Sequence, residues 1–82
     1  MKYRIAVADA AKAQLRALPK EIRRNIGHRI NLLAEDLAGD VKKLHAKHAL
    51  YRLRVGEYRV LFQIADGAIE IYAVKRRKDA YA

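Results

Sequence analysis

The chain has 82 residues and contains no cysteine, serine or threonine. Without cysteine it forms no disulfide bond and performs no thiolate chemistry, which is compatible with a reducing cytoplasm. Serine, threonine and cysteine are also the usual protein nucleophiles of acyl transfer. Acyl transfer therefore has no candidate residue in this protein.

Long apolar segments are absent too. No run approaches the roughly 18 residues that a membrane span requires. Charged residues at Lys2, Arg4 and Asp9 interrupt the N-terminal segment, so no signal-peptide core fits there. The length suits one domain with a modest core, which we expect over residues 1–82. We expect a cytoplasmic protein without a membrane partner.

Metal-ligating and phosphate-loop motifs are equally scarce. With cysteine absent, a zinc site would depend on His28, His45 and His48 together with scattered carboxylates. Lys43 and Lys47 lie close to the last two histidines and would repel a cation, so exposed histidines in a basic segment are the favoured interpretation. The Gly-Glu and Asp-Gly pairs are typical of ordinary turns, and no glycine-rich phosphate loop is present. We expect neither a metal ion nor a cofactor.

What the chain has in excess is positive charge. Its net charge is +9 and its pI is about 10.2. Residues 1–41 hold eight Lys or Arg against five Asp or Glu, whereas residues 42–82 hold ten against four. Such a clustered excess points to a nucleic acid, an acidic protein or a membrane surface. The membrane is the weakest of the three, since no helix pattern sets a Lys-rich face against bulky aromatics.

The first half of the chain predicts a strand followed by two helices. Residues 2–7 alternate apolar and polar side chains, as a half-buried strand does. Asp9 is expected to cap the first helix, Pro19 suits the first turn of the second, and Gly39-Asp40 should end it. We expect a helical hairpin whose apolar face needs a sheet to cover it. The stripe of the second helix consists of Ile22, Ile26, Ile30, Leu33 and Leu37.

The second half predicts a three-stranded antiparallel meander. Residues 51–64 form two alternating strands that turn at Gly56-Glu57, and an Asp66-Gly67 turn adds a third strand. Residues 42–48, before the meander, form a basic connection of undefined structure. The fold class is thus α+β: an N-terminal strand, an α-helical hairpin and a C-terminal meander. Its core face should carry Leu53, Val55, Val60, Phe62, Ile64, Ile69, Ile71 and Ala73, and its outer face Arg52, Arg54, Arg59, Leu61, Gln63, Glu70 and Tyr72.

The register of the meander brings arginines together. A two-residue turn at Gly56-Glu57 pairs Arg54 with Arg59, and paired residues share a face. Like charges directly opposite each other weaken a sheet, so a sheet that tolerates them is suited to hold a polyanion. Arg52 extends this face, and four consecutive cations at 75–78 follow the third strand. The expected pairs between the second and third strands are Ile64–Ile69, Phe62–Ile71, Leu61–Tyr72 and Arg59–Val74.

This set of side chains favours phosphate chemistry. The planar fork of arginine donates two parallel hydrogen bonds to a phosphate and keeps its charge. Tyr81 is a residue that can stack on a splayed base. In cleavage of RNA through its own 2′-hydroxyl the protein needs no nucleophile, only orientation, charge stabilisation and a route for two proton transfers.

The whole chain resembles the RelE/ParE toxin superfamily, and the RelE branch in particular. The resemblance rests on two segments, Leu50-Tyr-Arg-Leu-Arg-Val-Gly-Glu-Tyr-Arg-Val-Leu-Phe62 and the closing Val74-Lys-Arg-Arg-Lys-Asp-Ala-Tyr81. It implies a RelE-like fold and a toxin of a toxin–antitoxin pair, silenced by a cognate antitoxin. The implied activity is ribosome-dependent cleavage of mRNA in the A site, which inhibits translation.

The resemblance also implies roles for single residues. Arg59 and Arg77 fall on arginines that stabilise phosphate charge, and Tyr81 falls on a tyrosine that orients or activates the attacking hydroxyl. These three are the expected catalytic residues. The expected RNA- and phosphate-binding residues are Arg52, Arg54, Arg76 and Lys78.

The chain departs from the family pattern at three of these positions. Arg52 and Arg54 stand where well-studied RelE-type toxins carry lysines, and Arg76 stands where many relatives have histidine. Arginine is a poor general base because its pKa exceeds about 12. The identity of the general acid and base therefore stays open, with Tyr81 the first candidate for the base. Two alternative functions stay open as well: a ParE-like inhibitor of DNA gyrase, and a non-catalytic member that binds nucleic acid or regulates transcription.

Overall fold

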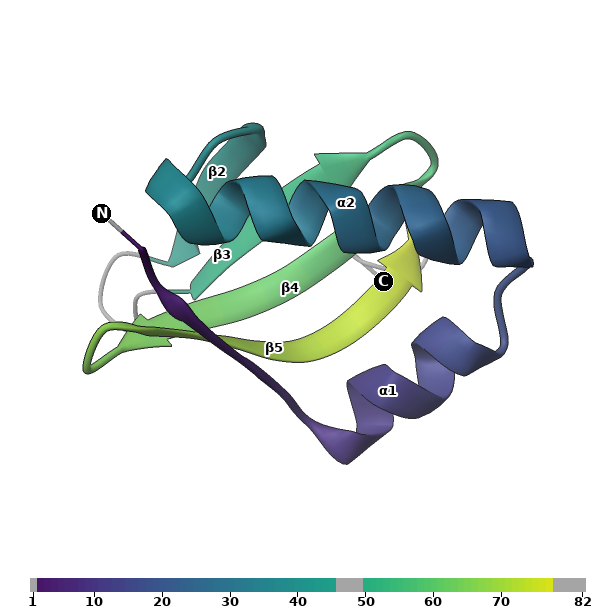
Figure 1. Ribbon diagram of the computed structural model, residues 1–82, viewed down its shortest axis with the longest axis horizontal. Helices are drawn as coiled ribbons and strands as arrows, with labels where there is room; N and C mark the ends of the chain where they lie inside the picture. The colour runs from purple at the N-terminus through teal and green to yellow at the C-terminus, as the bar shows by residue number, and fades with distance from the viewer. Residues whose placement is uncertain (1, 46–49, 78–82) are drawn as a thin grey trace.

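The chain folds into one mixed sheet with two helices on one of its faces (Figure 1). The computed structural model describes residues 2–45 and 50–77. The sheet has five strands in the order β1-β5-β4-β3-β2. We call the face opposite the helices the outer face. The elements are β1 (Arg4–Val7), α1 (Asp9–Arg16), α2 (Lys20–Asp36), β2 (Asp40–His45), β3 (Leu50–Val55), β4 (Tyr58–Ala65) and β5 (Ala68–Arg76).

The predicted meander is present as β3, β4 and β5, but it is only the centre of the sheet. The segment left undefined by the sequence supplies β2, which pairs antiparallel with β3. The N-terminal strand β1 adds to the other side, parallel to β5. The prediction of a separate three-stranded meander was therefore incomplete. Parallel partners cannot be joined by a tight turn, and here both helices and the strands β2, β3 and β4 separate β1 from β5 in the sequence, so no local turn signal predicts this pairing.

The starts of both helices differ slightly from expectation. Ala8 is the N-cap of α1 and makes no side-chain capping hydrogen bond, so the prediction of Asp9 as the cap was wrong. Asp9 instead lies in the first turn, where its negative charge still favours the positive end of the helix. Pro19 is the N-cap of α2 rather than a residue of its first turn. Within residues 2–45 and 50–77, no helix is long and apolar enough to cross a membrane.

The end of α2 is fixed by backbone conformation. Leu37 adopts a left-handed conformation with φ 61°, and its N–H donates to the Leu33 carbonyl at 2.8 Å. The helix thus ends before Gly39. Gly39 has φ 123°, and a Cβ there would meet Leu53 Cδ1 at 2.7 Å. Only glycine suits a position with both this conformation and this close approach.

The core lies between the helices and the sheet. From α2, Ile26, Ile30 and Leu33 are buried, which confirms the predicted apolar stripe. Tyr51 and Phe62, partners across β3 and β4, stack with ring centroids 5.4 Å apart. Each fully buried large apolar side chain contributes about 1.5–3 kcal/mol of burial free energy. The sheet contributes Leu53, Val55, Val60, Phe62, Ile69, Ile71 and Val74 to this core.

A β-bulge between β4 and β5 changes the predicted register. The pairs Ile64–Ile69 and Phe62–Ile71 are confirmed. Beyond them the register shifts, and Leu61 pairs with Ala73 rather than with Tyr72. One inserted residue moves every later side chain of a strand to the opposite face.

The bulge therefore reassigns the end of β5. Val74 packs in the core at the helix-side position that was expected for Ala73. Arg59 pairs with Lys75, so the predicted Arg59–Val74 pair was wrong. This shift brings a lysine to the outer face beside the predicted arginine pair.

Candidate functional site: a cationic row on the outer face

Three cations from three adjacent strands lie in one line across the outer face. Arg54 of β3 pairs with Arg59 of β4, as predicted, and Arg59 pairs in turn with Lys75 of β5. Directly opposed residues have Cβ atoms only about 4.5–5.5 Å apart, and opposed like charges destabilise a sheet. We call Arg54, Arg59 and Lys75 the cationic row. On β2, Asp40 lies opposite Arg54, but Arg59 has a cation on each side in the register, so the row suits an anionic ligand.

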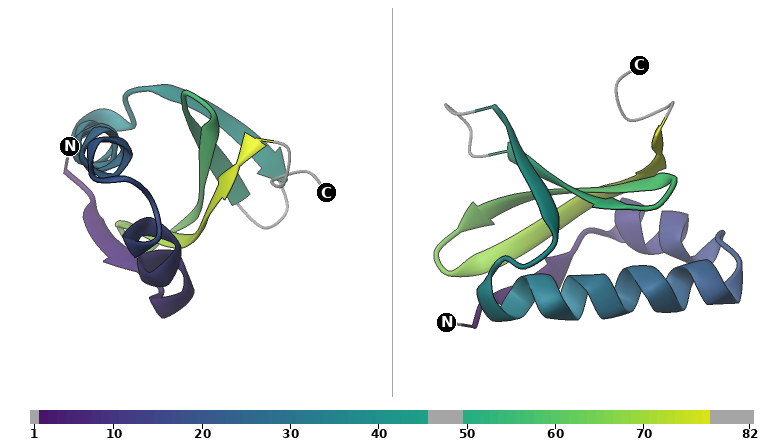
Figure 2. Two further views of the ribbon diagram at one scale, coloured as in Figure 1. Left: turned by 90° about the vertical axis from the view of Figure 1, so that its right-hand side faces the viewer. Right: turned by 90° about the horizontal axis from the view of Figure 1, so that it is seen from above.

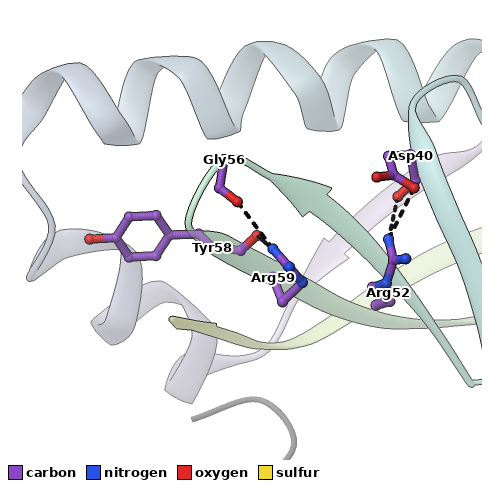
Figure 3. A network of polar contacts seen from close by, with 5 residues as sticks. All are labelled: Asp40, Arg52, Gly56, Tyr58 and Arg59. Carbon is purple, nitrogen blue, oxygen red and sulfur yellow. Dashed lines mark hydrogen bonds and ion pairs between the residues drawn. The ribbon is translucent and has the colours of Figure 1, made fainter. Parts of the chain in front are cut away.

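Arg59 is the most constrained member of the row. Its side chain is buried, with only 3% of the residue exposed. Its Nη1 donates to the carbonyl oxygens of Gly56 at 3.1 Å and Tyr58 at 3.0 Å (Figure 3). These hydrogen bonds fix the position of the guanidinium at the turn between β3 and β4. Its Nε is buried and has no partner among the described residues, and no described carboxylate forms an ion pair with it. A bound anion would supply the acceptor that this buried charge lacks.

Arg52 is held by a neighbouring strand. Its Nη1 donates to the carbonyl oxygen of Asp40 at 2.9 Å and to Asp40 Oδ1 at 3.2 Å (Figure 3). The Arg52 side chain is 13% exposed, and its Nε is also buried without a partner in the described chain. Asp40 itself pairs with Arg54, and Lys42 pairs with Arg52. Asp40 is thus the one described carboxylate that forms an ion pair on this face.

The remaining predicted site residues are placed differently. Arg76 pairs with Tyr58, which packs against the core, so Arg76 extends from the face opposite to Arg59 and Lys75. Arg77 follows β5, and its N–H donates to the Glu57 carbonyl at 2.7 Å, beside the turn that Arg59 fastens. Lys78 and Tyr81 lie outside the described residues. The structure therefore brings Arg52, Arg54 and Arg59 together with Lys75, and sets Arg76 apart.

A tyrosine borders a separate groove on the sheet. Tyr72, the bulged residue, lines an open groove of about 310 Å³ together with residues of β1 and β4. Partial burial raises the pKa of the Tyr72 phenol above its ordinary 10.0 by desolvation. Nearby, Gln63 Nε2 donates to Glu70 Oε1 at 2.7 Å. A phenol with a raised pKa stays protonated at neutral pH, so Tyr72 is a poor general base.

A family model and a curated relative each match nearly the whole chain. Residues 5–81 match the family model described as ParE toxin of type II toxin-antitoxin system, parDE. The chain belongs to the RelE/ParE superfamily of toxins of type II toxin–antitoxin systems. The curated Toxin RelE3 of Methanocaldococcus jannaschii is 31% identical over 87 residues, covering 95% of this chain and 94% of its own length.

Solved structures agree with this assignment. The archaeal RelE–RelB complex from Pyrococcus horikoshii OT3 matches with a TM-score of 0.84 and 30% identity, covering 96% of this chain and 99% of that one. A free-state mutant of E. coli toxin RelE superposes with a TM-score of 0.83 at 18% identity, covering 99% of this chain and 90% of that one. The second likeness concerns the fold alone. The five-stranded sheet with two helices is therefore the fold of a RelE-like toxin.

Lys75 is the residue of this toxin's cationic row that sequence reasoning missed. Uniform alternation through β5 places Val74, not Lys75, beside Arg59. A signal was available, because Val74 is a large apolar residue that uniform alternation assigns to the outer face. A bulge at Tyr72 returns Val74 to the core and moves Lys75 outward. Among residues 2–45 and 50–77, no group of three or more His, Cys, Asp or Glu side chains could hold a metal ion.

Proposed function

We propose that the toxin is an endoribonuclease that cleaves mRNA in the ribosomal A site and so inhibits translation. The observation that carries this proposal is the cationic row, flanked by Arg52, on a face that no described helix covers. Three cations at strand spacing complement successive oxygens of a phosphodiester backbone. The similarity to RelE proteins supports the same function.

The chemistry follows from what the side chains can do. The RNA 2′-hydroxyl attacks the adjacent phosphorus, a cyclic phosphate forms, and the bond to the 5′ oxygen of the next nucleotide breaks. Arg59, already fixed by two backbone carbonyls, stabilises the negative charge that grows on the phosphate oxygens. Arg77, whose backbone N–H is bonded to the same turn, contributes a second positive charge. Because Arg59 is oriented before substrate arrives, little reorganisation is needed in the transition state.

Two proton transfers remain to be assigned. The arginines retain their protons, so a different group must accept the proton of the 2′-hydroxyl. The family resemblance assigns this role to Tyr81. Lys75 is a candidate for the second transfer, to the leaving 5′ oxygen, because its ammonium group donates a proton more readily than a guanidinium does and Lys75 lies next to Arg59 in the register. Because neither candidate is a strong acid or base, the reaction depends on the ribosome to position the mRNA.

The toxin is also expected to bind a cognate antitoxin. Its structural relatives include RelE in complex with RelB. An antitoxin segment with acidic residues would neutralise the cationic row and occlude the phosphate site. Acidic partners bind such a surface at rates and affinities that fall as salt rises.

The first test is primer extension on mRNA recovered from a reconstituted translation reaction. Wild-type toxin should create new 5′ ends at A-site codons, and only when ribosomes are present. Arg77→Ala and Tyr81→Phe should weaken the cleavage, whereas Lys12→Ala, an exposed change on α1, should not. Intact mRNA in the presence of folded wild-type toxin would overturn the proposal.

A gyrase inhibitor is the second candidate, because the matching family model is that of ParE toxins. Parallel assays of DNA supercoiling and mRNA cleavage distinguish the two functions. A gyrase inhibitor would change DNA supercoiling in a purified gyrase reaction and leave mRNA intact. Arg77→Ala would abolish mRNA cleavage but need not affect gyrase.

A further inference from the structure

The groove beside Tyr72 lies on the same face of the sheet as the cationic row. Gln63 and Arg59 are four residues apart on β4, and this even spacing places both side chains on the outer face. Glu70 of β5 pairs with Gln63, and Ala6 of β1 pairs with Glu70, so these residues share that face. Figure 2 shows α2 on the other side of the sheet. The groove and the row are therefore parts of one surface.

The groove is within reach of an RNA strand that the row holds. Along β4, the four residues from Arg59 to Gln63 span about 13 Å at the rise of a strand. Between these two positions lie Leu61 and Ala73, which pair across β4 and β5 and are both buried. A strand whose phosphate lies at Arg59 can therefore place a nearby base in the groove.

The lining of the groove differs from the cationic row in its charge. Among the described residues that line it, Glu70 is the one charged side chain. A carboxylate repels a phosphate, so the groove does not suit the RNA backbone. A nucleobase is uncharged and flat, and bases stack on aromatic side chains. Tyr72 offers such a ring, since it is 38% exposed and lines the groove.

Gln63 and Glu70 together present a hydrogen-bond acceptor beside a donor. Gln63 Nε2 donates one hydrogen to Glu70 Oε1 at 2.7 Å and keeps a second N–H for a ligand. Glu70 retains acceptor capacity on its carboxylate oxygens. Adenine and cytosine carry an amino donor beside a ring-nitrogen acceptor, which is the complementary pattern. Uracil and guanine carry the opposite pattern, a carbonyl acceptor beside a ring N–H.

We propose that the groove is a base subsite, in which Tyr72 stacks on an adenine or a cytosine and Glu70 accepts a hydrogen bond from its amino group. Gln63 donates to the ring nitrogen of the same base and holds the Glu70 carboxylate in position. This inference rests on the proposed endoribonuclease function, because it concerns the strand that the cationic row holds for cleavage. Contacts to the backbone carry no sequence information, whereas this subsite makes RNA selection depend on the base.

The test compares the binding of cytosine and uracil, two pyrimidines that differ in the group that faces Glu70. Fluorescence anisotropy measures the affinity of the toxin for short oligocytidylate and oligouridylate of equal length. Glu70→Gln removes the carboxylate of the groove, and Glu21→Gln removes an exposed carboxylate of α2 as the matched control. Tyr72→Leu removes the aromatic ring, and Tyr72→Phe keeps it. Circular dichroism and thermal unfolding check that all four variants are folded.

We expect the wild type to bind oligocytidylate about tenfold more tightly than oligouridylate, as one well-placed base contact allows. Glu70→Gln should lower this ratio to about 1, because an amide can both donate and accept. Glu21→Gln should leave the ratio unchanged. Tyr72→Leu should weaken the binding of both RNAs roughly tenfold, the order of loss for one stacking contact, and Tyr72→Phe should bind like the wild type.

Equal affinity of the wild type for the two RNAs, or a ratio that Glu70→Gln does not change, would overturn the inference. So would a Tyr72→Leu variant that binds RNA normally but loses antitoxin binding, because the groove would then be an antitoxin contact. The proposed nuclease function fails separately. If the wild type shows the Glu70-dependent preference but leaves mRNA intact on ribosomes, the base subsite stands without that function. Cleavage in the A site by a toxin without base preference would retain the function and remove the subsite.

Discussion

The two basic regions of this toxin differ in how their cations are held. On the outer face, Arg59 is buried and fastened to two carbonyl oxygens, and Arg52 is fastened to Asp40. On α2 the cations are exposed and have no ion-pair partner among the described residues. Fixed cations favour chemistry, because their orientation is set before the ligand arrives. Exposed cations favour electrostatic attachment, which tolerates many geometries.

The largest effect is expected from changing the fixed arginine. Arg59→Lys keeps the charge but loses the planar group that bridges Gly56 and Tyr58. Ribosome-dependent cleavage should fall by about 10²–10³, the cost of removing one preorganised donor. Arg54→Lys, at the exposed partner position, should cost far less. Single-turnover cleavage rates of the two variants provide the measurement. Similar reductions in rate would contradict a special role for the fixed orientation of Arg59.

The next effect tests the register set by the bulge. Lys75 and Arg76 are neighbours in sequence but extend from opposite faces of β5. Lys75→Gln should lower the cleavage rate by roughly 10–100-fold if Lys75 contributes charge or a proton at the phosphate. Arg76→Gln removes the same charge and should change the rate little. A reversed order of the two effects in the primer-extension assay would refute the bulged register.

A smaller effect, in the opposite direction, is expected at Asp40. Its carboxylate occupies Arg52 at 3.2 Å, where a phosphate would compete. A partly exposed pair of this kind contributes about 0.2–1 kcal/mol, so Asp40→Asn should tighten RNA binding up to about fivefold. Glu35→Gln, which removes the carboxylate paired with Lys2 on the helical side, is the matched control. Fluorescence anisotropy with a short RNA measures both, and weaker binding by Asp40→Asn would contradict competition.

The smallest effect concerns Tyr72, which lies outside both basic regions. Burial raises the pKa of its phenol above 10.0, so the folded state holds the proton more tightly than the unfolded state does. That contribution to stability is complete below about pH 10 and is lost as pH rises through the folded pKa. Wild type and Tyr72→Phe should therefore diverge in stability only above about pH 10, with the wild type losing more. Urea unfolding at pH 8 and pH 10.5 provides the comparison, and a difference confined to pH 8 would contradict it.

Much of the core was predictable because it depends on local periodicity. The stripe of α2 and the pairs Arg54–Arg59 and Phe62–Ile71 follow from spacing and turn residues. The two sheet edges were not predictable in this way. Strand β1 finds β5 more than sixty residues away, and the segment that forms β2 showed no clear alternation. Each of these two strands pairs with one neighbour only, at an edge of the sheet.

The residues of the candidate site were likewise only partly predictable from local spacing. Spacing alone placed Arg52, Arg54 and Arg59 on one face, and the family resemblance added Arg77 and Tyr81. Uniform alternation did not place Lys75 on this face, because one bulged residue inverts the alternation of the strand end; the apolar Val74 was the only sign of the bulge in the sequence. Nor could spacing reveal Asp40, which reaches Arg52 only because β2 joins the sheet.

By itself, the sequence determined the excess of positive charge, the absence of protein nucleophiles and the sorting of arginines to one face. These properties depend on composition and on the two-residue period of a strand. Tertiary structure alone decided which cations become fixed. A buried guanidinium loses its hydrating water and therefore needs hydrogen-bond acceptors from the protein. Only the folded sheet places the oxygens of Gly56, Tyr58 and Asp40 within hydrogen-bonding distance.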